Sequence, residues 1–480
     1  IRYSLFNINI KNLNSFSFLI SKKFILIIFY YILSEKRLVR PPTEGNICLR
    51  CKGSRLLCGK KSCPILLKKS VLKSMVPFKL DSAIKDVEIF GASPPGVFVG
   101  HFNYPNVFIG PLIPYQEFDL NLGISDNFIL DAPELWFGKE MIDVIRYRSS
   151  LVRNNFKSNV RIGRTTRKNT PPIKIQRLLD ASQELAMAAR PVDTETKLIK
   201  MNFRMLMDNH APPIGPTGMT EKINITENVK VHPKVEYCVS DIDLKASEAV
   251  SDYLYFEGHV PESTIRRVFS AGLLGQKSNR RLVPTRWSIT AVDDIISKAL
   301  IEEIKKFPEI DDYQIFESTY LDNHFKILLF PGKFLYEMNE CWAPNTLWNV
   351  SPNGNNQYRK PQIMTDYEFY QGRKNYASNI TGAYYAARLS VCEYLYNIKR
   401  QARVLIFREV SGGYLVPLGV WVIRETVRNA MLACDPLILD NFDDSLNKMA
   451  DGFMVDYKYW RNSSKIINFI KTQKTLHEFL

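Results

Sequence analysis

Four cysteines within sixteen residues constrain the fold of this chain more than any other sequence feature. They follow the pattern Cys48-x2-Cys51-x6-Cys58-x4-Cys63. Four thiolates at about 2.3 Å from one zinc ion form a closed tetrahedral site, which can stabilise a segment too short to build its own core. No His, Asp or Glu lies inside the cluster. The pattern therefore predicts a structural Zn²⁺ module at residues 41–70, without an open position for catalysis.

Three other uses of these cysteines stay open: a redox dithiol, an iron–sulfur cluster, and free thiols. Gly53 and Gly59 favour the metal, because each follows a cysteine where a side chain would crowd the sulfurs. The remaining cysteines are scattered along the chain, which is typical of small buried residues in a reducing compartment. We therefore expect a non-secreted, cytoplasmic protein. These scattered cysteines are Cys238, Cys341, Cys392 and Cys434.

The charge balance favours a polyanionic partner. The chain has 64 Lys and Arg against 49 Asp and Glu, a formal net charge of +15. Such a surplus attracts DNA, RNA or an anionic surface, although a generally basic, solvated surface is the alternative. Within the predicted zinc module, the cations outnumber what a tetrathiolate zinc needs for balance, so we expect them to contact DNA phosphates. These predicted DNA-binding residues are Arg50, Lys52, Arg55, Lys60 and Lys61.

The pattern from residue 71 to 455 predicts one α+β core, possibly of two subdomains, with a mixed or antiparallel sheet and packed helices. Strands grouped together, rather than alternating with helices, argue against a doubly wound parallel sheet. We expect a strand pair within 97–109, a meander over 313–320, 325–330 and 334–338, and a hairpin of 402–410 and 414–422 around Gly412-Gly413. Helices are expected at 175–190, 261–274, 295–306, 381–400 and 424–434, the third opening on a capping box at 290–293. Residues 154–172 are expected to form a loop.

The two ends of the chain are expected to lie outside this core. Residues 24–33 are strongly apolar, but ten residues are too few to span a bilayer, so no membrane partner is expected. Residues 1–40 are interpreted as a non-native or disordered extension. Residues 456–480 are expected to form a flexible C-terminal tail.

The last eight residues carry a pattern typical of peptides that bind a sliding clamp. Gln473 is followed by Leu476, Phe479 and Leu480. In one helical turn the three apolar residues share a face and could fill an apolar pocket, while Gln473 bonds into a polar one. The alternative is the end of an amphipathic helix whose Leu and Phe pack on the core. A Leu at the last position, where an aromatic residue is usual, should weaken clamp binding.

Candidates for catalysis are present, without a complete constellation. Paired carboxylates could hold Mg²⁺ for phosphodiester hydrolysis. Against this, capping accounts for Asp293 and turn chemistry for several others, and no GxxxxGK[ST], HExxH or GxGxxG is present. Whether the protein is an enzyme therefore stays open. The candidates are His210, Arg286, Asp293, Asp294, Glu317, Asp322, His324, Asp366 and Glu368.

Aromatic and basic residues alternate between Tyr358 and Tyr385, for example at Tyr367, Arg373 and Tyr376. Such a segment suits stacking on single-stranded nucleic acid. The alternative, which we favour, is a half-buried surface with cations reaching outward.

From about residue 45 to its end, the chain resembles the archaeal Nre family of DNA repair proteins. The resemblance is carried by the cysteine cluster, the C-terminal peptide and four segments dense in Pro, Gly, His and charge, which begin at Phe90, Ala189, His210 and Val283. It implies a C4 zinc finger on Cys48, Cys51, Cys58 and Cys63. It also implies a clamp-interaction motif on Gln473, Leu476, Phe479 and Leu480, and a role in the response to DNA damage.

These observations lead to one main hypothesis and two alternatives. The main one is a repair factor that binds DNA and is recruited to the sliding clamp (PCNA). The first alternative is a metal-dependent nuclease or nucleotide-binding hydrolase acting in DNA repair. The second is an adaptor that docks on the clamp without contacting nucleic acid.

Overall fold

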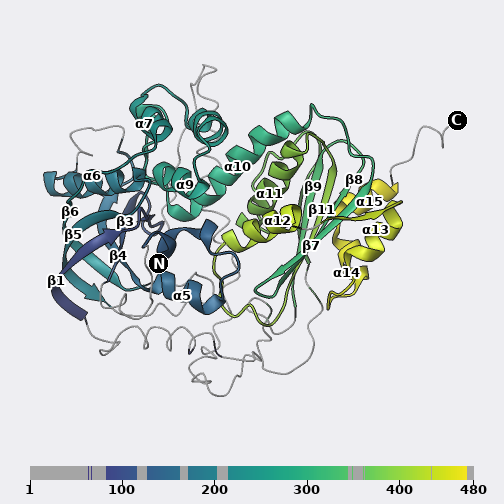
Figure 1. Cartoon of the computed structure of the whole chain (residues 1–480), viewed down its shortest axis with the longest axis horizontal. Coiled ribbons are helices and arrows are strands. Elements are labelled where there is room, and N and C mark those ends of the chain that lie inside the picture. Colours follow the sequence, from purple (N-terminus) through teal and green to yellow (C-terminus); the bar gives the residue numbers. More distant parts are fainter. Residues whose placement is uncertain are drawn as a thin grey trace, which may run out of the picture.

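Two six-stranded sheets organise the part of the chain that the structure, a computed structural model, describes (Figure 1). The described residues are 63, 66, 83–115, 127–162, 171–202, 215–343, 349, 361, 363–433 and 435–472. Strand grouping and helices packed on the sheets confirm the α+β class and the mixed sheets. The predicted zinc module lies outside the described residues except for Cys63 and Leu66.

Sheet 1 has the strand order β1-β5-β6-β4-β3-β2, and only β4 and β6 run parallel. Residues that alternate between buried and exposed positions form its strands, as in Val192–Asn202, because one face packs on the core. The strand pair predicted within 97–109 is confirmed as β2 and β3. The strands are β1 (Ala83–Ser93), β2 (Val97–Val99), β3 (Asn106–Pro114), β4 (Leu151–Asn159), β5 (Val192–Asn202) and β6 (Thr217–Ile225).

Sheet 2 has the order β10-β9-β11-β8-β7-β12. Its central strand β11 alternates between two separate cores: Val404 and Ile406 face one, and Leu405 and Phe407 face the other. Both faces of this sheet are therefore covered by helices. The strands are β7 (Tyr313–Tyr320), β8 (Asn323–Phe330), β9 (Leu335–Trp342), β10 (Ile363–Glu368), β11 (Arg403–Val410) and β12 (Leu437–Leu439).

Helices α10, α11 and α12 lie between the two sheets, and α13, α14 and α15 cover the far face of sheet 2 (Figure 1). One continuous core joins sheet 1, these middle helices and the near face of sheet 2. The helices are η3 (Asn127–Asp131), η4 (Pro133–Leu135), α5 (Met141–Ser149), α6 (Ile173–Met187), α7 (Pro233–Ser240), α8 (Ala246–Glu248), η5 (Ala249–Glu257), α9 (Glu262–Ser270), η6 (Lys277–Asn279), α10 (Thr285–Ile304), α11 (Gly382–Asn397), α12 (Trp421–Ala433), α13 (Phe442–Met449), α14 (Tyr457–Ser463) and α15 (Lys465–Thr472).

The three strands of the predicted meander are confirmed, but the expected pairing of the second strand with the third is wrong. β7 and β8 form an antiparallel pair, but β11 lies between β8 and β9, antiparallel to the first and parallel to the second. All eight residues of β9 are buried, which suits a strand deep in a sheet. The four-residue link 331–334 can extend to about 13 Å, enough to pass over one strand.

The predicted hairpin at 402–422 is also wrong. Residues 403–410 form β11, but no strand follows at 414–420, and α12 begins at Trp421. Tyr414, Val416 and Leu418 are buried in alternation, which imitates a strand. Pro417 has no N–H to donate to a ladder, and the Leu418 N–H donates to the Tyr414 hydroxyl instead.

Two further boundaries differ from expectation. Helix α10 begins at Thr285, after Pro284, so Asp293 lies in the middle of the helix and does not cap it. Residues 154–159, expected in a loop, belong to β4, whose polar residues alternate with buried ones. In both cases polar side chains within a helix or strand were interpreted as belonging to a cap or a loop.

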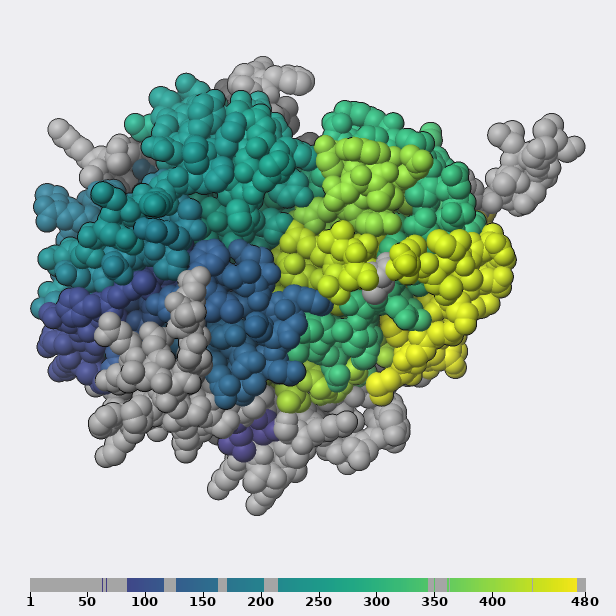
Figure 2. Space-filling model, in the orientation of Figure 1, coloured from purple at the N-terminus to yellow at the C-terminus, as the bar shows by residue number. Residues whose placement is uncertain are grey.

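The packed body extends to Thr472. Trp460 of α14, and Ile466 and Ile467 of α15, are buried against the far face of sheet 2. Within the expected tail, residues 457–463 and 465–472 are therefore helical and packed on the body, in the yellow region at the right-hand edge of Figure 2. The residues after Thr472 lie outside the described part of the chain.

Candidate functional site

Most of the predicted binding residues lie outside the described residues. This holds for Cys48, Cys51 and Cys58, for the clamp-binding Gln473, Leu476, Phe479 and Leu480, for the predicted DNA contacts Arg50, Lys52, Arg55, Lys60 and Lys61, and for His210. Cys63 is described and is partly exposed.

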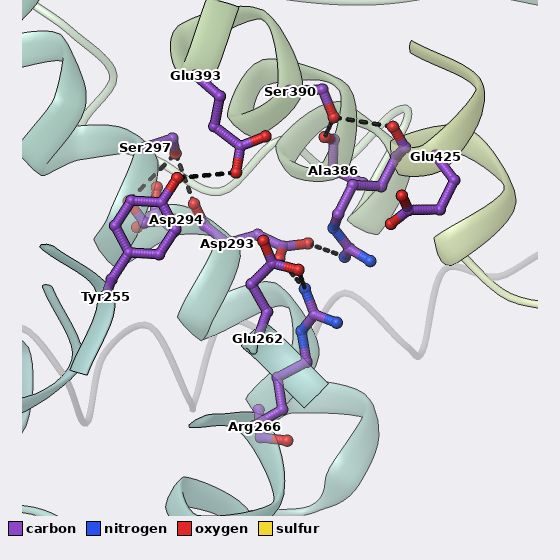
Figure 3. Close-up of polar contacts among 12 residues, drawn as sticks. Tyr255, Glu262, Arg266, Asp293, Asp294, Ser297, Ala386, Ser390, Glu393 and Glu425 are labelled. Carbon is purple, nitrogen blue, oxygen red and sulfur yellow. Dashed lines mark hydrogen bonds and ion pairs between the residues drawn. The ribbon is translucent and has the colours of Figure 1, made fainter. Parts of the chain in front are cut away.

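Two of the candidate carboxylates, Asp293 and Asp294 of α10, lie among the helices between the sheets (Figure 3). Asp293 of α10 is completely buried and lies between two arginines. Its Oδ1 is 2.9 Å from Arg266 Nη2 of α9, and its Oδ2 is 2.5 Å from Arg424 Nη2 of α12. A carboxylate shared by two guanidiniums has its oxygens committed to hydrogen bonds. Asp293 therefore joins three helices.

A second arginine of α12 extends this arrangement. Arg428 forms ion pairs with Glu262 of α9, with Glu393 of α11 at 2.7 Å, and with Glu425 at 3.0 Å. The Tyr255 hydroxyl of η5 donates to Glu393 at 2.9 Å. We call the seven charged residues the interhelical cluster: Glu262, Arg266, Asp293, Glu393, Arg424, Glu425 and Arg428.

The interhelical cluster has four carboxylates and three guanidiniums, so one negative charge is in excess. Burial would raise the pKa of Glu262, but the charges of Arg428, Arg266 and Arg424 outweigh it and lower this pKa to about 2. For Glu393 and Glu425 burial prevails and raises the pKa. Of the four carboxylates, Glu393 and Glu425 are therefore the two whose protonation the surroundings favour.

A neighbouring group of polar residues surrounds Arg388 of α11. Its guanidinium lies 2.5 Å from Asp294 of α10, 3.1 Å from Glu368 of β10, and within 3.1 Å of Ser297 Oγ. Burial would raise the pKa of Asp294, but Arg388 and Lys298 outweigh it and lower this pKa. The nearby Asp366 bonds to Arg373 and to two backbone N–H groups. These carboxylates each have a structural partner.

The remaining candidates are separate from this group. Glu317 is 70% exposed and pairs with Lys326 at 3.2 Å. His324 Nε2 is 2.7 Å from Ser411 Oγ, and the Asp322 carboxylate accepts from the Gly413 N–H. The last two contacts tie the β7–β8 turn to the end of β11. Arg286 is exposed in the first turn of α10.

No three His, Cys, Asp or Glu side chains in the described part of the chain are placed to hold a metal ion. Within the same residues, no helix is long and apolar enough to cross a membrane.

The aromatic–basic segment that could have stacked on nucleic acid is half-buried or buried over most of its described residues and is buried at its end. Tyr384 and Tyr385 are buried, and Arg373 is paired with Asp366. The interpretation as a packed surface is therefore the one that the structure supports for these residues.

Sequence reasoning did not identify the arginines that organise the interior. The available signal was Arg388, the one cation in the largely apolar helix sequence GAYYAARLSVCEYL. A buried arginine requires carboxylate or carbonyl partners, and only the fold brings these together from other helices.

Comparison with known proteins extends over nearly the whole chain. The family model described as "Archaeal Nre, N-terminal" matches residues 57–349, and "Archaeal Nre, C-terminal" matches residues 368–479. The first match ends after β9 and the second begins at the end of β10, so the two segments build sheet 2 together.

Three curated relatives are similar along most of their length. The chain is 38% identical to "DNA repair protein NreA" of Archaeoglobus fulgidus, over 86% of this chain and 95% of the relative. It is 36% identical to "DNA repair protein NreB" of the same organism, over 90% and 100%. It is 34% identical to "DNA repair protein NreA" of Haloferax volcanii, over 73% and 80%.

No solved structure matches the chain. The two family models and the extent of these alignments nevertheless leave one assignment, which agrees with the resemblance noted in the sequence: the chain belongs to the archaeal Nre family.

Proposed function

We propose that this protein is a DNA repair factor that binds DNA and is recruited to the sliding clamp (PCNA) through its C-terminal peptide. The observation that carries the proposal is the similarity to three proteins named as DNA repair proteins, at 34% to 38% identity. Relatives this similar over most of their length usually retain a common process, whereas the site chemistry has to be argued from residues.

The charge of the chain supports DNA as the partner. The net charge of +15 attracts phosphates, and Lys60 and Lys61 are adjacent cations in a segment without acidic residues. The arginines of the interhelical cluster, in contrast, are not available to phosphates, because buried carboxylates neutralise their charge. DNA contacts are therefore expected from surface cations.

A zinc ion fits the donor set of the N-terminal cysteines. Cys48, Cys51, Cys58 and Cys63 would supply four thiolates, the full complement of a structural site. The buried cysteines Cys238, Cys341 and Cys392 lie in the core, far along the chain from this set. The ion would hold the cationic segment in a defined shape and supply no catalytic step.

The clamp-binding proposal is supported by the position of α15. This helix is anchored by Ile466 and Ile467, and its last residues, Lys471 and Thr472, are exposed. The peptide that begins at Gln473 therefore starts from an exposed point on an anchored helix. Such a connection suits a short motif that reaches a partner.

Two measurements on the full-length protein test the proposal. Fluorescence anisotropy with labelled duplex, forked and single-stranded DNA should show binding that weakens linearly with the logarithm of salt concentration. Lys60→Gln/Lys61→Gln should reduce affinity and lower the salt slope by about 2. The matched control is Lys305→Gln/Lys306→Gln, adjacent lysines already paired with Glu302 and Glu303, which should bind as the wild type.

Clamp recruitment is tested separately by deleting residues 473–480. The truncated chain should lose binding to the purified clamp and retain its affinity for DNA. Undetectable DNA binding by the wild type at low salt would contradict the first part of the proposal, and unchanged clamp binding by the truncated chain would contradict the second.

A further inference from the structure

One face of β4 carries polar side chains in the middle of sheet 1; Arg153 and Asn155 are half-buried and Lys157 is exposed. Val152, Asn154 and Phe156 are buried, while the alternate residues Arg153, Asn155 and Lys157 lie on the other face. The three residues on this other face follow one another at about 6.6 to 6.8 Å, since a strand rises about 3.3 to 3.4 Å per residue. Two cations and one amide therefore form a row along the strand.

Arg153 is poised for an anion. Its guanidinium carbon lies 3.6 Å from the centre of the Phe98 ring on β2, so the planar group rests on an aromatic face. Its buried Nε has no hydrogen-bond partner among the described residues. Burial and the nearby charge of Arg148 lower the pKa of Arg153 to about 9. An anion beside this guanidinium would offset the electrostatic cost that burial and Arg148 impose on its charge.

Apolar side chains flank this row on both neighbouring strands. Phe108 of β3 is 43% exposed and lies opposite Lys157. Met219 of β6 is 55% exposed and lies opposite Asn155. An aromatic ring beside cations provides a stacking surface for a base, and Met219 adds apolar surface next to the row. We call Phe98, Phe108, Arg153, Asn155, Lys157 and Met219 the β4 face.

The strands that build the β4 face favour phosphate, and Asp131, a buried carboxylate beside Gly96 and Leu112, interacts with the charges of Arg148 and Arg267. Strands β2, β3 and β4 contain no acidic residue. On β6, the acidic Glu221 is occupied by Lys197 of β5 at 3.4 Å. This differs from the segment around Tyr384, where the cations are neutralised and the rings are buried.

We infer that the β4 face binds single-stranded DNA, with Arg153 and Lys157 on phosphates and Phe108 stacked on a base. The inference rests on the proposed DNA-binding function and names a surface for it. A single strand fits because its base faces are free, whereas in a duplex they are stacked on one another and cannot reach Phe108.

The test compares single-stranded and duplex oligonucleotides on full-length variants. Removing one base–aromatic contact should weaken single-strand binding by on the order of 10- to 100-fold, so Phe108→Ala is the primary variant and Arg153→Gln the second. The control is Phe90→Ala, an exposed phenylalanine (48%) of the same sheet that faces Glu195 on β5 and should have no effect. Equal thermal unfolding midpoints establish that the folded state is retained.

A photocrosslink locates the contact independently. A single strand containing 5-iodo-deoxyuridine, irradiated with the wild-type protein, should label peptides that contain Phe98 or Phe108. Single-strand binding unchanged in both variants, losses of equal size for duplex and single strand, or labelling confined to residues 41–70 would each overturn the inference. The first and third of these results leave DNA binding itself intact, whereas absence of any binding by the wild type would end both proposals. An acidic peptide that loses affinity in Phe108→Ala while single-stranded DNA does not would also overturn it.

Discussion

The Asp293 carboxylate lies 2.5 Å from the Arg424 guanidinium, although 131 positions separate the two residues. Both side chains are almost completely buried. The pair joins α10 to α12, and Arg266 of α9 completes the contact at 2.9 Å. The helices that separate the two sheets are thus held together by charge as well as by apolar packing.

Removing the Asp293 carboxylate should destabilise the protein strongly. In Asp293→Ala two buried guanidiniums lose their shared partner, and breaking a buried pair from one side costs about 3–5 kcal/mol. We expect this loss in the free energy of unfolding, measured by urea denaturation. Glu317→Gln is the control: this carboxylate is exposed and its pair with Lys326 contributes about 0–1 kcal/mol. Equal stability of the two variants would show that the Asp293 contacts contribute little.

The excess carboxylate of the interhelical cluster should make stability depend on pH. The pKa of Glu425 in the folded protein is raised above its ordinary 4.5, mainly by burial. Between the two values the folded chain binds more protons than the unfolded chain, so the free energy of unfolding falls as pH rises through this window. Glu425→Gln removes the excess charge and should flatten this decline, raising the urea midpoint near neutral pH.

Urea midpoints measured from about pH 5 to about pH 8 check this expectation. Glu302→Gln serves as the control, because this carboxylate of α10 is 71% exposed and paired with Lys305. The Glu302 variant should keep the slope of the wild type. A Glu425 variant that loses stability at neutral pH would mean that the pair with Arg428 outweighs the cost of burial.

The buried Glu337 carboxylate should help to hold α15 on sheet 2. Glu337 of β9 is fully buried and accepts hydrogen bonds from Ser464 Oγ and from the N–H groups of Lys465 and Ile466, the first turn of α15. Glu337→Leu leaves these donors unsatisfied, at about 1–3 kcal/mol for each buried group. We expect faster cleavage of residues 456–472 in limited proteolysis.

The matched control for Glu337 is Asp443→Asn. Asp443 also contacts α15, through Lys471 at 2.7 Å, but it is 75% exposed. An exposed pair contributes about 0–1 kcal/mol, so the proteolysis rate should stay near that of the wild type. The same rate in both variants would show that Glu337 does not anchor the helix.

The four N-terminal cysteines should bind one zinc ion per chain. Elemental analysis after gel filtration should find zinc in the wild type and its loss in Cys58→Ser, because a structural site needs all four thiolates. Cys392→Ala alters a cysteine buried in α11 and should retain the metal. A colourless protein without stoichiometric zinc would contradict the module, and a coloured one with iron would identify the cluster instead.

Local periodicity was sufficient for the elements that form from neighbouring residues. The helix expected at 175–190 is α6, and that expected at 381–400 is α11. The pairing of β9 with β11 was not predictable in this way, because no local signal distinguishes a hairpin link from one that passes over a strand. The apolar alternation at Tyr414, Val416 and Leu418 was misleading for a related reason. These side chains are buried in the core, but the segment that carries them is not a strand.

By itself the sequence determined the α+β class, the family, and the two short motifs that await metal and clamp measurements. Cysteine spacing and apolar periodicity extend over only a few neighbouring residues, so they can be recognised in the sequence without knowledge of the fold. Only the tertiary structure decided that Asp293 lies between two arginines and that Arg153 rests on Phe98 at the open face of β4. Both depend on side chains from different elements meeting, and the energy of a charge depends on its burial and its neighbours.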